Sequence, residues 1–205
     1  VLGGVAIFLY VGIEVGIPGT LIFYLSAEST GLGAGATAIA GAIAAIYWLL
    51  MLVGRSLSSV ISGKVSSRTQ LIAVSVAGIA FVALAIFMPE SIKGSMPGFA
   101  DGAFIMKEVP ISAMFLVLCG LCTSVMWGGI FNLAVEGLGK YTAQASGIFM
   151  MLVVGGGIMP LIQHNVLALN IGYIPSYWLV VAMLAYILFY ALIGCKNVNK
   201  NIPVD

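Results

Sequence analysis

Six long apolar stretches constrain this sequence more than any other feature. A helix that crosses the hydrocarbon core of a bilayer needs about 20 mostly apolar residues. Backbone groups in hydrocarbon must be hydrogen-bonded within their own segment, and these stretches are too long for the strands of a β-barrel. The expected membrane-spanning helices are about 2–26, 34–62, 70–88, 111–135, 144–169 and 174–194. We therefore predict an all-α membrane protein, with one six-helix bundle over residues 1–195 and a cytoplasmic tail over 196–205.

The composition excludes most other classes of protein. Of the 205 residues, 61% are apolar and only 7% are charged, whereas soluble domains carry roughly 25% charged residues. A disordered chain, a disulfide scaffold and a nucleic-acid-binding protein are excluded on this ground. Cys119 and Cys122 form a C-x-x-C, but it lies inside an apolar run without the second ligand pair of a zinc site. We expect neither a metal nor a cofactor.

The distribution of Lys and Arg predicts the orientation of the chain in the membrane, because cytoplasmic loops carry an excess of them. The segment 89–110 joins the third and fourth spans as a long loop, where two lysines are diluted by three acidic residues. The opposite side holds Lys64, Arg68, Lys140, Lys196 and Lys200, with Arg55 somewhat deeper. Both termini are therefore expected in the cytoplasm of an inner-membrane protein. The first span begins at Val1 without Met or a basic leader, which we interpret as a sequence entered midway rather than as a signal peptide.

Glu14 is the sharpest candidate for a functional residue. It lies in the middle of the first span, where an ionised carboxylate is costly unless it is paired, hydrated or protonated. Tyr10 is four residues earlier on the same helical face and can donate a hydrogen bond to it. We interpret Glu14 as a contact to a solute in a central cavity, with a part in proton movement. The alternative is a structural hydrogen bond between helices.

The run Gly16-Ile17-Pro18-Gly19 predicts a break in this first helix. Pro18 removes a backbone donor and frees the carbonyl of Glu14, four residues back. Interrupted helices at membrane depth are tolerated where they line a cavity. A simple packing kink is the alternative interpretation. Because Pro18 lies close to Glu14, we favour a gating role for it.

The fifth span combines Gly155-Gly156-Gly157, Pro160 and Gln163-His164-Asn165. Small residues of this kind permit close helix contact or bending. The Gln163 amide has both donors and an acceptor, which suits the hydroxyls of a sugar. His164 is the one histidine, and we favour an interfacial group over a proton relay.

Two residues of the fourth span are further candidates. The indole of Trp127 has a flat apolar face on which a sugar ring can stack, although membrane helices also bury Trp simply to pack. Asn132 lies nearer the inner end of this span, where its amide makes either a hydrogen bond between helices or a contact in the cavity. Arg55 is about 10 Å from the inner end of the second span, where it can snorkel to the cytoplasm or cross-link helix ends as a gate.

Enzyme motifs are missing from the sequence. It contains no G-x-S-x-G, no H-E-x-x-H and no phosphate-binding glycine loop. Ser146 has a nucleophile-like context, but its one possible base, His164, lies eighteen residues along the same helix, about 27 Å away. We therefore do not expect an enzyme.

These motifs resemble a known family. The runs Leu9–Val15, Gly54-Arg55, Ile130–Lys140 and Gly155–Gln163 occur in the order found in the carboxy-terminal half of the fucose/glucose–galactose:proton symporters of the major facilitator superfamily. Lys64 and Arg68 follow the second of these runs. The resemblance covers nearly all of the chain and is closer to the glucose/galactose branch, since fucose permease has an amide where Glu14 stands. Gly128 departs from the proline usual before the Ile130-Phe131 pair.

The resemblance implies a twelve-helix sugar transporter, of which this chain supplies helices seven to twelve as two inverted three-helix repeats. A monosaccharide would bind between the two halves, a proton would be the coupling ion, and the acidic residues thought to couple it lie largely in the missing amino-terminal half. The best cavity-facing contacts in this chain are then Tyr10, Glu14, Trp127, Asn132 and Gln163.

A self-contained six-helix channel or scaffold, acting as a homo-oligomer, is the rival hypothesis. Six further apolar spans upstream would support the half-transporter. Its partners are then the bilayer and the missing half, or a second copy of itself.

Overall fold

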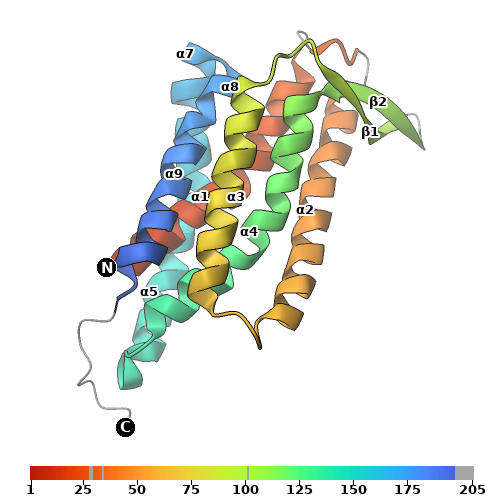
Figure 1. The fold of residues 1–205 in the computed structure, drawn as a ribbon. Coiled ribbons are helices and arrows are strands. Elements are labelled where there is room, and N and C mark those ends of the chain that lie inside the picture. The colour runs from red at the N-terminus through yellow and green to blue at the C-terminus, as the bar shows by residue number, and fades with distance from the viewer. Residues whose placement is uncertain (28–29, 34, 101, 197–205) are drawn as a thin grey trace.

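The computed structural model describes residues 1–27, 30–33, 35–100 and 102–196, with only the backbone of Ala100. Six helices are long and apolar enough to cross a membrane, and they run side by side in one bundle (Figure 1). They are α1 (Leu2–Ser26), α2 (Ala36–Ile61), α3 (Ser67–Phe87), α4 (Ile111–Val135), the fifth span (Gly139–Ile171) and the sixth span (Tyr173–Gly194). The prediction of a six-helix membrane protein is confirmed. Of the predicted tail, 196–205, all but Lys196 lies outside the described residues.

Local signals explain where several helices begin and end. The side chain of Ser66 accepts a hydrogen bond from the backbone N–H of Thr69 and so caps the start of α3. Met88, which precedes Pro89, has the extended conformation that proline imposes on its neighbour, and α3 ends there. After α4, Gly137 has a φ of +77° that favours glycine, and the chain turns toward the fifth span.

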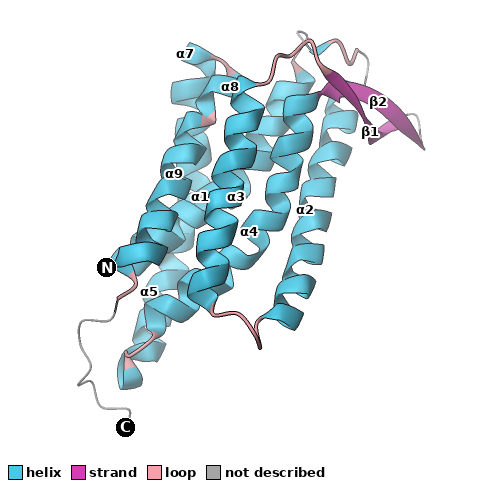
Figure 2. Ribbon diagram, in the orientation of Figure 1, coloured by secondary structure: helices cyan, strands magenta, loops and turns pink. Residues whose placement is uncertain are grey.

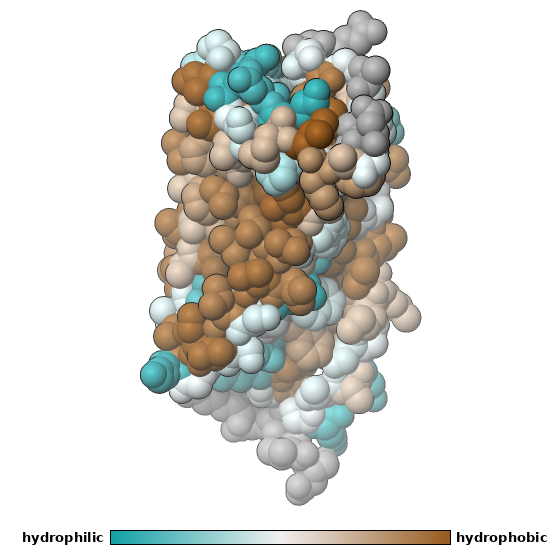
Figure 3. Space-filling model, turned by 90° about the vertical axis from the view of Figure 1, so that its right-hand side faces the viewer, coloured by the Kyte–Doolittle hydropathy of each residue, from teal (hydrophilic) through white to brown (hydrophobic). Residues whose placement is uncertain are grey.

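The helices α1 and α4 form the centre of the bundle. α1 packs against α2, α4, the fifth span and α9 (Trp178–Phe189), while α4 also packs against α3. The side chains of Ile7, Ile13 and Ile17 in α1 are fully buried, as are Leu116 and Met126 in α4. The outer helices expose apolar side chains instead, and hydrophobic atoms cover the middle of the face shown in Figure 3 while hydrophilic ones gather toward its ends. This distribution is that of a bundle embedded in lipid.

The fifth span is not one regular helix. It contains η2 (Gly139–Tyr141), α5 (Thr142–Met151), the 3₁₀ turn η3 (Leu152–Val154), α6 (Gly155–Leu161), the π-helix η4 (Ile162–Ala168) and α7 (Leu169–Ile171). The sixth span begins with α8 (Tyr173–Ser176), continues as α9 and ends in the π-helical η5 (Tyr190–Gly194). Irregular helical turns therefore concentrate in the last two spans.

The expectation of a plain loop over 89–110 is wrong. The segment forms an antiparallel hairpin of β1 (Lys93–Ala100) and β2 (Ala103–Pro110), the sheet shown in Figure 2. Gly102 has a φ of +78°, which suits the tight turn between the strands. Small and proline residues weakened the strand signal in the sequence, whereas packing against α2 and α4 stabilises the pairing.

Candidate functional site

The carboxylate of Glu14 is paired with a guanidinium from another helix. Nη2 of Arg55 in α2 donates to Oε1 of Glu14 in α1 across 3.3 Å. The Glu14 side chain is 16% exposed and that of Arg55 is 53% exposed. The pair therefore lies at an open edge of the bundle and not in its sealed core.

Two adjoining hollows open around this ion pair, and Arg55 lines both. The smaller, of about 150 Å³, is bounded by Glu14, Arg55 and the α2 side chains Trp48, Met51 and Leu52. The larger, of about 320 Å³, is lined by Arg55, Ser58, Ser59, Ser62, Ser124, Val125, Trp127 and Gly128. Hydroxyls, a guanidinium and an indole together form a surface that can both hydrogen-bond a solute and stack against it.

The close approach of α2 to α4 sets the position of Arg55. A Cβ on Gly54 would collide with the Ser124 side chain, and a Cβ on Gly120 would collide with the Tyr47 carbonyl oxygen. The Tyr47 and Thr123 hydroxyls are also hydrogen-bonded across this contact, at 2.9 Å. Small residues thus let the two helices touch, as is common between membrane helices, and place Arg55 beside the larger hollow.

An aromatic wall extends from the ion pair toward α4. The Tyr10 ring lies 6.0 Å from that of Trp127, which stacks in turn on Phe131 at 6.4 Å. The Tyr10 hydroxyl is buried and finds no hydrogen-bond partner among the described residues, although Glu14 and Arg55 both act on it electrostatically. Tyr10 therefore lies beside Glu14, as the spacing of four residues predicted, while Arg55 donates to the carboxylate from α2.

The predicted break at Pro18 is wrong, because α1 is a continuous helix from Leu2 to Ser26. Two contacts support the backbone at this point. The Tyr177 hydroxyl donates to the Ile17 carbonyl oxygen at 2.9 Å, inside the core. Gly16 leaves room for the Gln163 side chain, whose Oε1 lies 2.8 Å from where a Cβ would stand.

Gln163 lies on the other side of α1 from the ion pair. It is fully buried, its Nε2 donates to Oγ of Ser176 at 3.5 Å, and its Oε1 has no partner among the described residues. Gly16, which faces it, is about 200° around the helix from Glu14. The structure therefore separates Gln163 from the two hollows. Of the predicted site residues, it brings together Tyr10, Glu14, Arg55 and Trp127.

Asn132 lies on the exposed surface of α4, one turn beyond Gly128. It lines neither hollow but continues the face that Ser124 and Gly128 present to the larger one. Pro18 is buried in α1 one turn from Glu14.

Sequence reasoning missed Trp48 and the serines of α2. Trp48 is exposed and bounds the smaller hollow. Arg55, Ser58, Ser59 and Ser62 share one face of α2 because their spacing follows the helical period. That spacing, read from Arg55, is the signal that could have found them.

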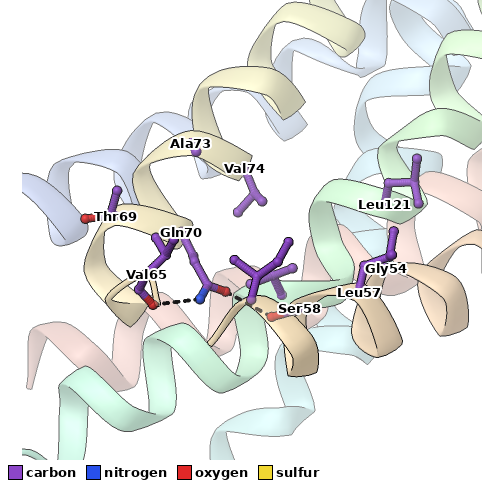
Figure 4. Close-up of a pocket in the computed structure, with 11 residues that line it drawn as sticks. Gly54, Leu57, Ser58, Val65, Thr69, Gln70, Ala73, Val74 and Leu121 are labelled. Carbon is purple, nitrogen blue, oxygen red and sulfur yellow. Dashed lines mark hydrogen bonds between the residues drawn. The ribbon is translucent and has the colours of Figure 1, made fainter. Parts of the chain in front are cut away.

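A third hollow, of about 390 Å³, lies at the α2–α3 turn (Figure 4) and shares Ser58 and Val125 with the larger hollow. Its polar groups bond to one another: Oγ of Ser58 donates to Oε1 of Gln70, and Nε2 of Gln70 donates to the Val65 carbonyl oxygen, both at 2.9 Å. The rest of its lining is almost wholly apolar. This hollow offers no free polar group to a solute, and we do not assign it to the site.

The fold defines the class of protein. It matches the crystal structure of a major facilitator superfamily transporter, FucP, in the outward conformation, with a TM-score of 0.77 at 20% identity. The match covers 96% of this chain and 42% of that chain, in its carboxy-terminal half. The bundle therefore has the fold of one half of a major facilitator superfamily transporter.

The sequence relatives are sugar transporters by name. The chain is 36% identical over 199 residues to the glucose/galactose transporter of Brucella abortus biovar 1 (strain 9-941), covering 96% of this chain and 42% of that protein. A putative glucose/galactose transporter of Helicobacter pylori (strain ATCC 700392 / 26695) is 34% identical over 201 residues, which cover 96% of this chain and 44% of that protein. No protein-family model matches. The chain thus spans less than half the length of these relatives, as the resemblance to half a sugar transporter predicted.

Proposed function

We propose that this chain is one half of a proton-coupled hexose symporter that works by alternating access. The observation that carries the proposal is the Glu14–Arg55 pair, which lies at an open edge of the bundle and lines a hollow with Trp48. The substrate class is supported by the relatives, which are named glucose/galactose transporters. The coupling ion is supported by FucP, whose fold this chain shares and which is described as a fucose:proton symporter.

The site residues divide the recognition of a hexose between them. Hydroxyl groups of a sugar donate to the Glu14 carboxylate and accept from the Arg55 guanidinium. The indole of Trp127 stacks on the apolar face of the ring, with Tyr10 behind it. Asn132 and Gln163 complete the set of proposed contacts, Gln163 through the orphaned Oε1 that a movement of α1 would uncover.

The ion pair also suggests how a proton takes part. A proton on Glu14 removes the negative charge that holds Arg55 and leaves a neutral carboxyl that can donate to the sugar. Loss of the proton restores the pair and draws α1 and α2 together. Pro18 would act in gating by leaving the Glu14 carbonyl without its helical donor, and Arg55 by changing partner.

The complete transporter requires a second six-helix half. The relatives are more than twice as long as this chain, and the apolar surface of the bundle leaves room both for lipid and for such a half. A self-contained homo-oligomeric channel is not favoured, because the relatives of this sequence are the longer proteins. We place the complete transporter in the inner membrane with the termini of this half in the cytoplasm, as its Lys and Arg distribution indicates.

Uptake by the complete transporter in proteoliposomes tests this function. Glucose, galactose and fucose are offered in turn, with the proton or the sodium gradient collapsed. We expect Glu14→Gln to abolish accumulation against a gradient while sugar exchange persists, since the neutral amide mimics the protonated carboxyl. Glu108→Gln, an exposed carboxylate on the hairpin, is the matched control and should transport normally. Normal proton-driven accumulation by Glu14→Gln would refute the proposal.

A further inference from the structure

The β1–β2 hairpin presents two chemically different faces. In the observed register, Gly94, Met96 and Gly98 pair with Val109, Lys107 and Ile105, and these residues share the face toward the bundle. Met96 and Val109 are buried there, and a Cβ on Gly98 would stand 3.0 Å from the Ile39 side chain of α2. This face explains why the hairpin stays on the bundle.

The outward face changes character along its length. Near the turn it carries Phe99 and Phe104, whose rings lie 5.3 Å apart, and Met106. Phe104 is 82% exposed, Met106 64% and Phe99 41%. At the opposite end the same face carries exposed Lys93, Ser95 and Glu108. The outward face is therefore polar where the hairpin leaves the bundle and apolar at its tip, which carries Phe99, Phe104 and Met106. The polar end suits water, and the apolar tip suits a less polar environment.

Other exposed aromatic residues lie at the same end of the bundle. Phe87 ends α3 and is 72% exposed, and its ring meets that of Trp178, at the start of α9, at 5.9 Å. Both positions are at the end of the bundle that carries the hairpin in Figure 1. Exposed aromatic rings gathered at one end of a membrane bundle are typical of the lipid–water interface. The tip of the hairpin therefore continues an aromatic belt that two spanning helices begin.

We propose that the tip of the hairpin, through Phe99, Phe104 and Met106, binds the lipid bilayer at the boundary between headgroups and acyl chains. The depth is limited by the backbone. Each strand pairs on one side only, and unpaired N–H and C=O groups are costly in hydrocarbon but are satisfied among hydrated headgroups. The proposal rests on the membrane-spanning fold and not on sugar transport.

Spin-label accessibility in the complete transporter, reconstituted in phosphatidylcholine–phosphatidylglycerol vesicles with its native cysteines replaced by serine, tests this placement. A nitroxide at Phe104→Cys is compared with one at Glu108→Cys, on the same face and strand, and one at Val76→Cys, an exposed position in the middle of α3. We expect the ratio of oxygen to nickel-chelate collisions at Phe104→Cys to lie between the two controls, several-fold above Glu108→Cys.

The other outcomes would overturn the proposal. A ratio equal to that at Glu108→Cys places the tip in water. Protection from both reagents places it against protein, either the second half or another copy of the transporter. Phe99→Cys repeats the measurement from the partner strand, in case the label at Phe104 disturbs the turn. Sugar uptake by each variant is measured in parallel, so that a failed placement is distinguished from a failed transport function.

Discussion

The first and fifth spans contain the same helix-disturbing residues but differ in their response. α1 carries Gly16, Pro18 and Gly19 and remains one unbroken α-helix. The fifth span carries the triplet Gly155-Gly156-Gly157 and Pro160, and it contains a 3₁₀ turn before α6 and a π-helix after it. Local composition therefore does not decide whether a membrane helix becomes irregular.

Burial distinguishes the two spans. Of the residues in the most apolar window of each, 61% are buried in α1 but only 11% in the fifth span. α1 has neighbours on several sides, and one of them supplies a hydroxyl to the Ile17 carbonyl beside Pro18, so the helix continues through the proline. The fifth span packs mainly against α1 and α8 and leaves most of its residues exposed, so a π turn meets little resistance. A helix with proline and glycine near its middle thus stays unbroken where packing surrounds it.

The contact between the two spans offers the largest test of this comparison. A side chain at Gly155 would collide with the Phe8 carbonyl oxygen, which is backbone and belongs to a helix that cannot retreat. We expect Gly155→Val to lower the free energy of unfolding by about 3 kcal/mol, the upper part of the usual range for overpacking. Thermal melting of the purified complete transporter measures the loss.

Gly157→Val is the matched control, because no atom beyond the neighbouring backbone of its own helix lies within 4 Å of the position its Cβ would take. Its effect should stay within about 1 kcal/mol, the scale of helix propensity. Equal melting temperatures for the two variants would show that the glycine triplet does not serve close packing.

The link between α1 and α2 gives the next largest effect. Arg55→Gln leaves the Glu14 carboxylate without its partner, and we expect a loss of about 2 kcal/mol, below the 3–5 kcal/mol of a buried pair because Arg55 is half exposed. The double variant with Glu14→Gln should recover at least half of that loss, since no charge is then stranded. Strictly additive losses in a double-mutant cycle would rule out the coupling.

The sequence predicted the helices well because hydrocarbon imposes one requirement on every span. The Glu14–Arg55 pair could not be predicted, because pairing two residues 41 positions apart requires knowing how each helix is rotated about its axis. That rotation depends on Gly54 and Gly120, which look like any small residue until their contacts are known. For the same reason, the sequence did not reveal that Gln163 lies behind α1.

Tyr177, which bonds to α1 beside Pro18, allows a test, with a smaller expected effect, of what supports the helix at the proline. Tyr177→Phe removes the buried hydroxyl that donates to the Ile17 carbonyl at 2.9 Å, and we expect a loss of about 1 kcal/mol. Tyr186→Phe removes an exposed hydroxyl that donates to the Leu2 carbonyl at 3.3 Å, nearer the end of the same helix. Its cost should be less than about 0.5 kcal/mol, because water replaces the lost bond. A larger loss from Tyr186→Phe in the melting experiment would contradict this ranking.

The smallest expected change in stability belongs to Gln163 in the fifth span. Its Oε1 is buried without a partner among the described residues, so Gln163→Leu should leave the free energy of unfolding within about 1 kcal/mol of the parent or raise it. Gln70→Leu is the matched control: both ends of that amide are bonded, so it should lose about 1–2 kcal/mol. A buried acceptor without a partner remains available to a sugar hydroxyl, and we expect Gln163→Leu to lower sugar uptake while Gln70→Leu retains it. Full uptake by Gln163→Leu at an unchanged melting temperature would remove Gln163 from the proposed sugar contacts and leave Asn132 and the two hollows around Arg55 as the site in this half.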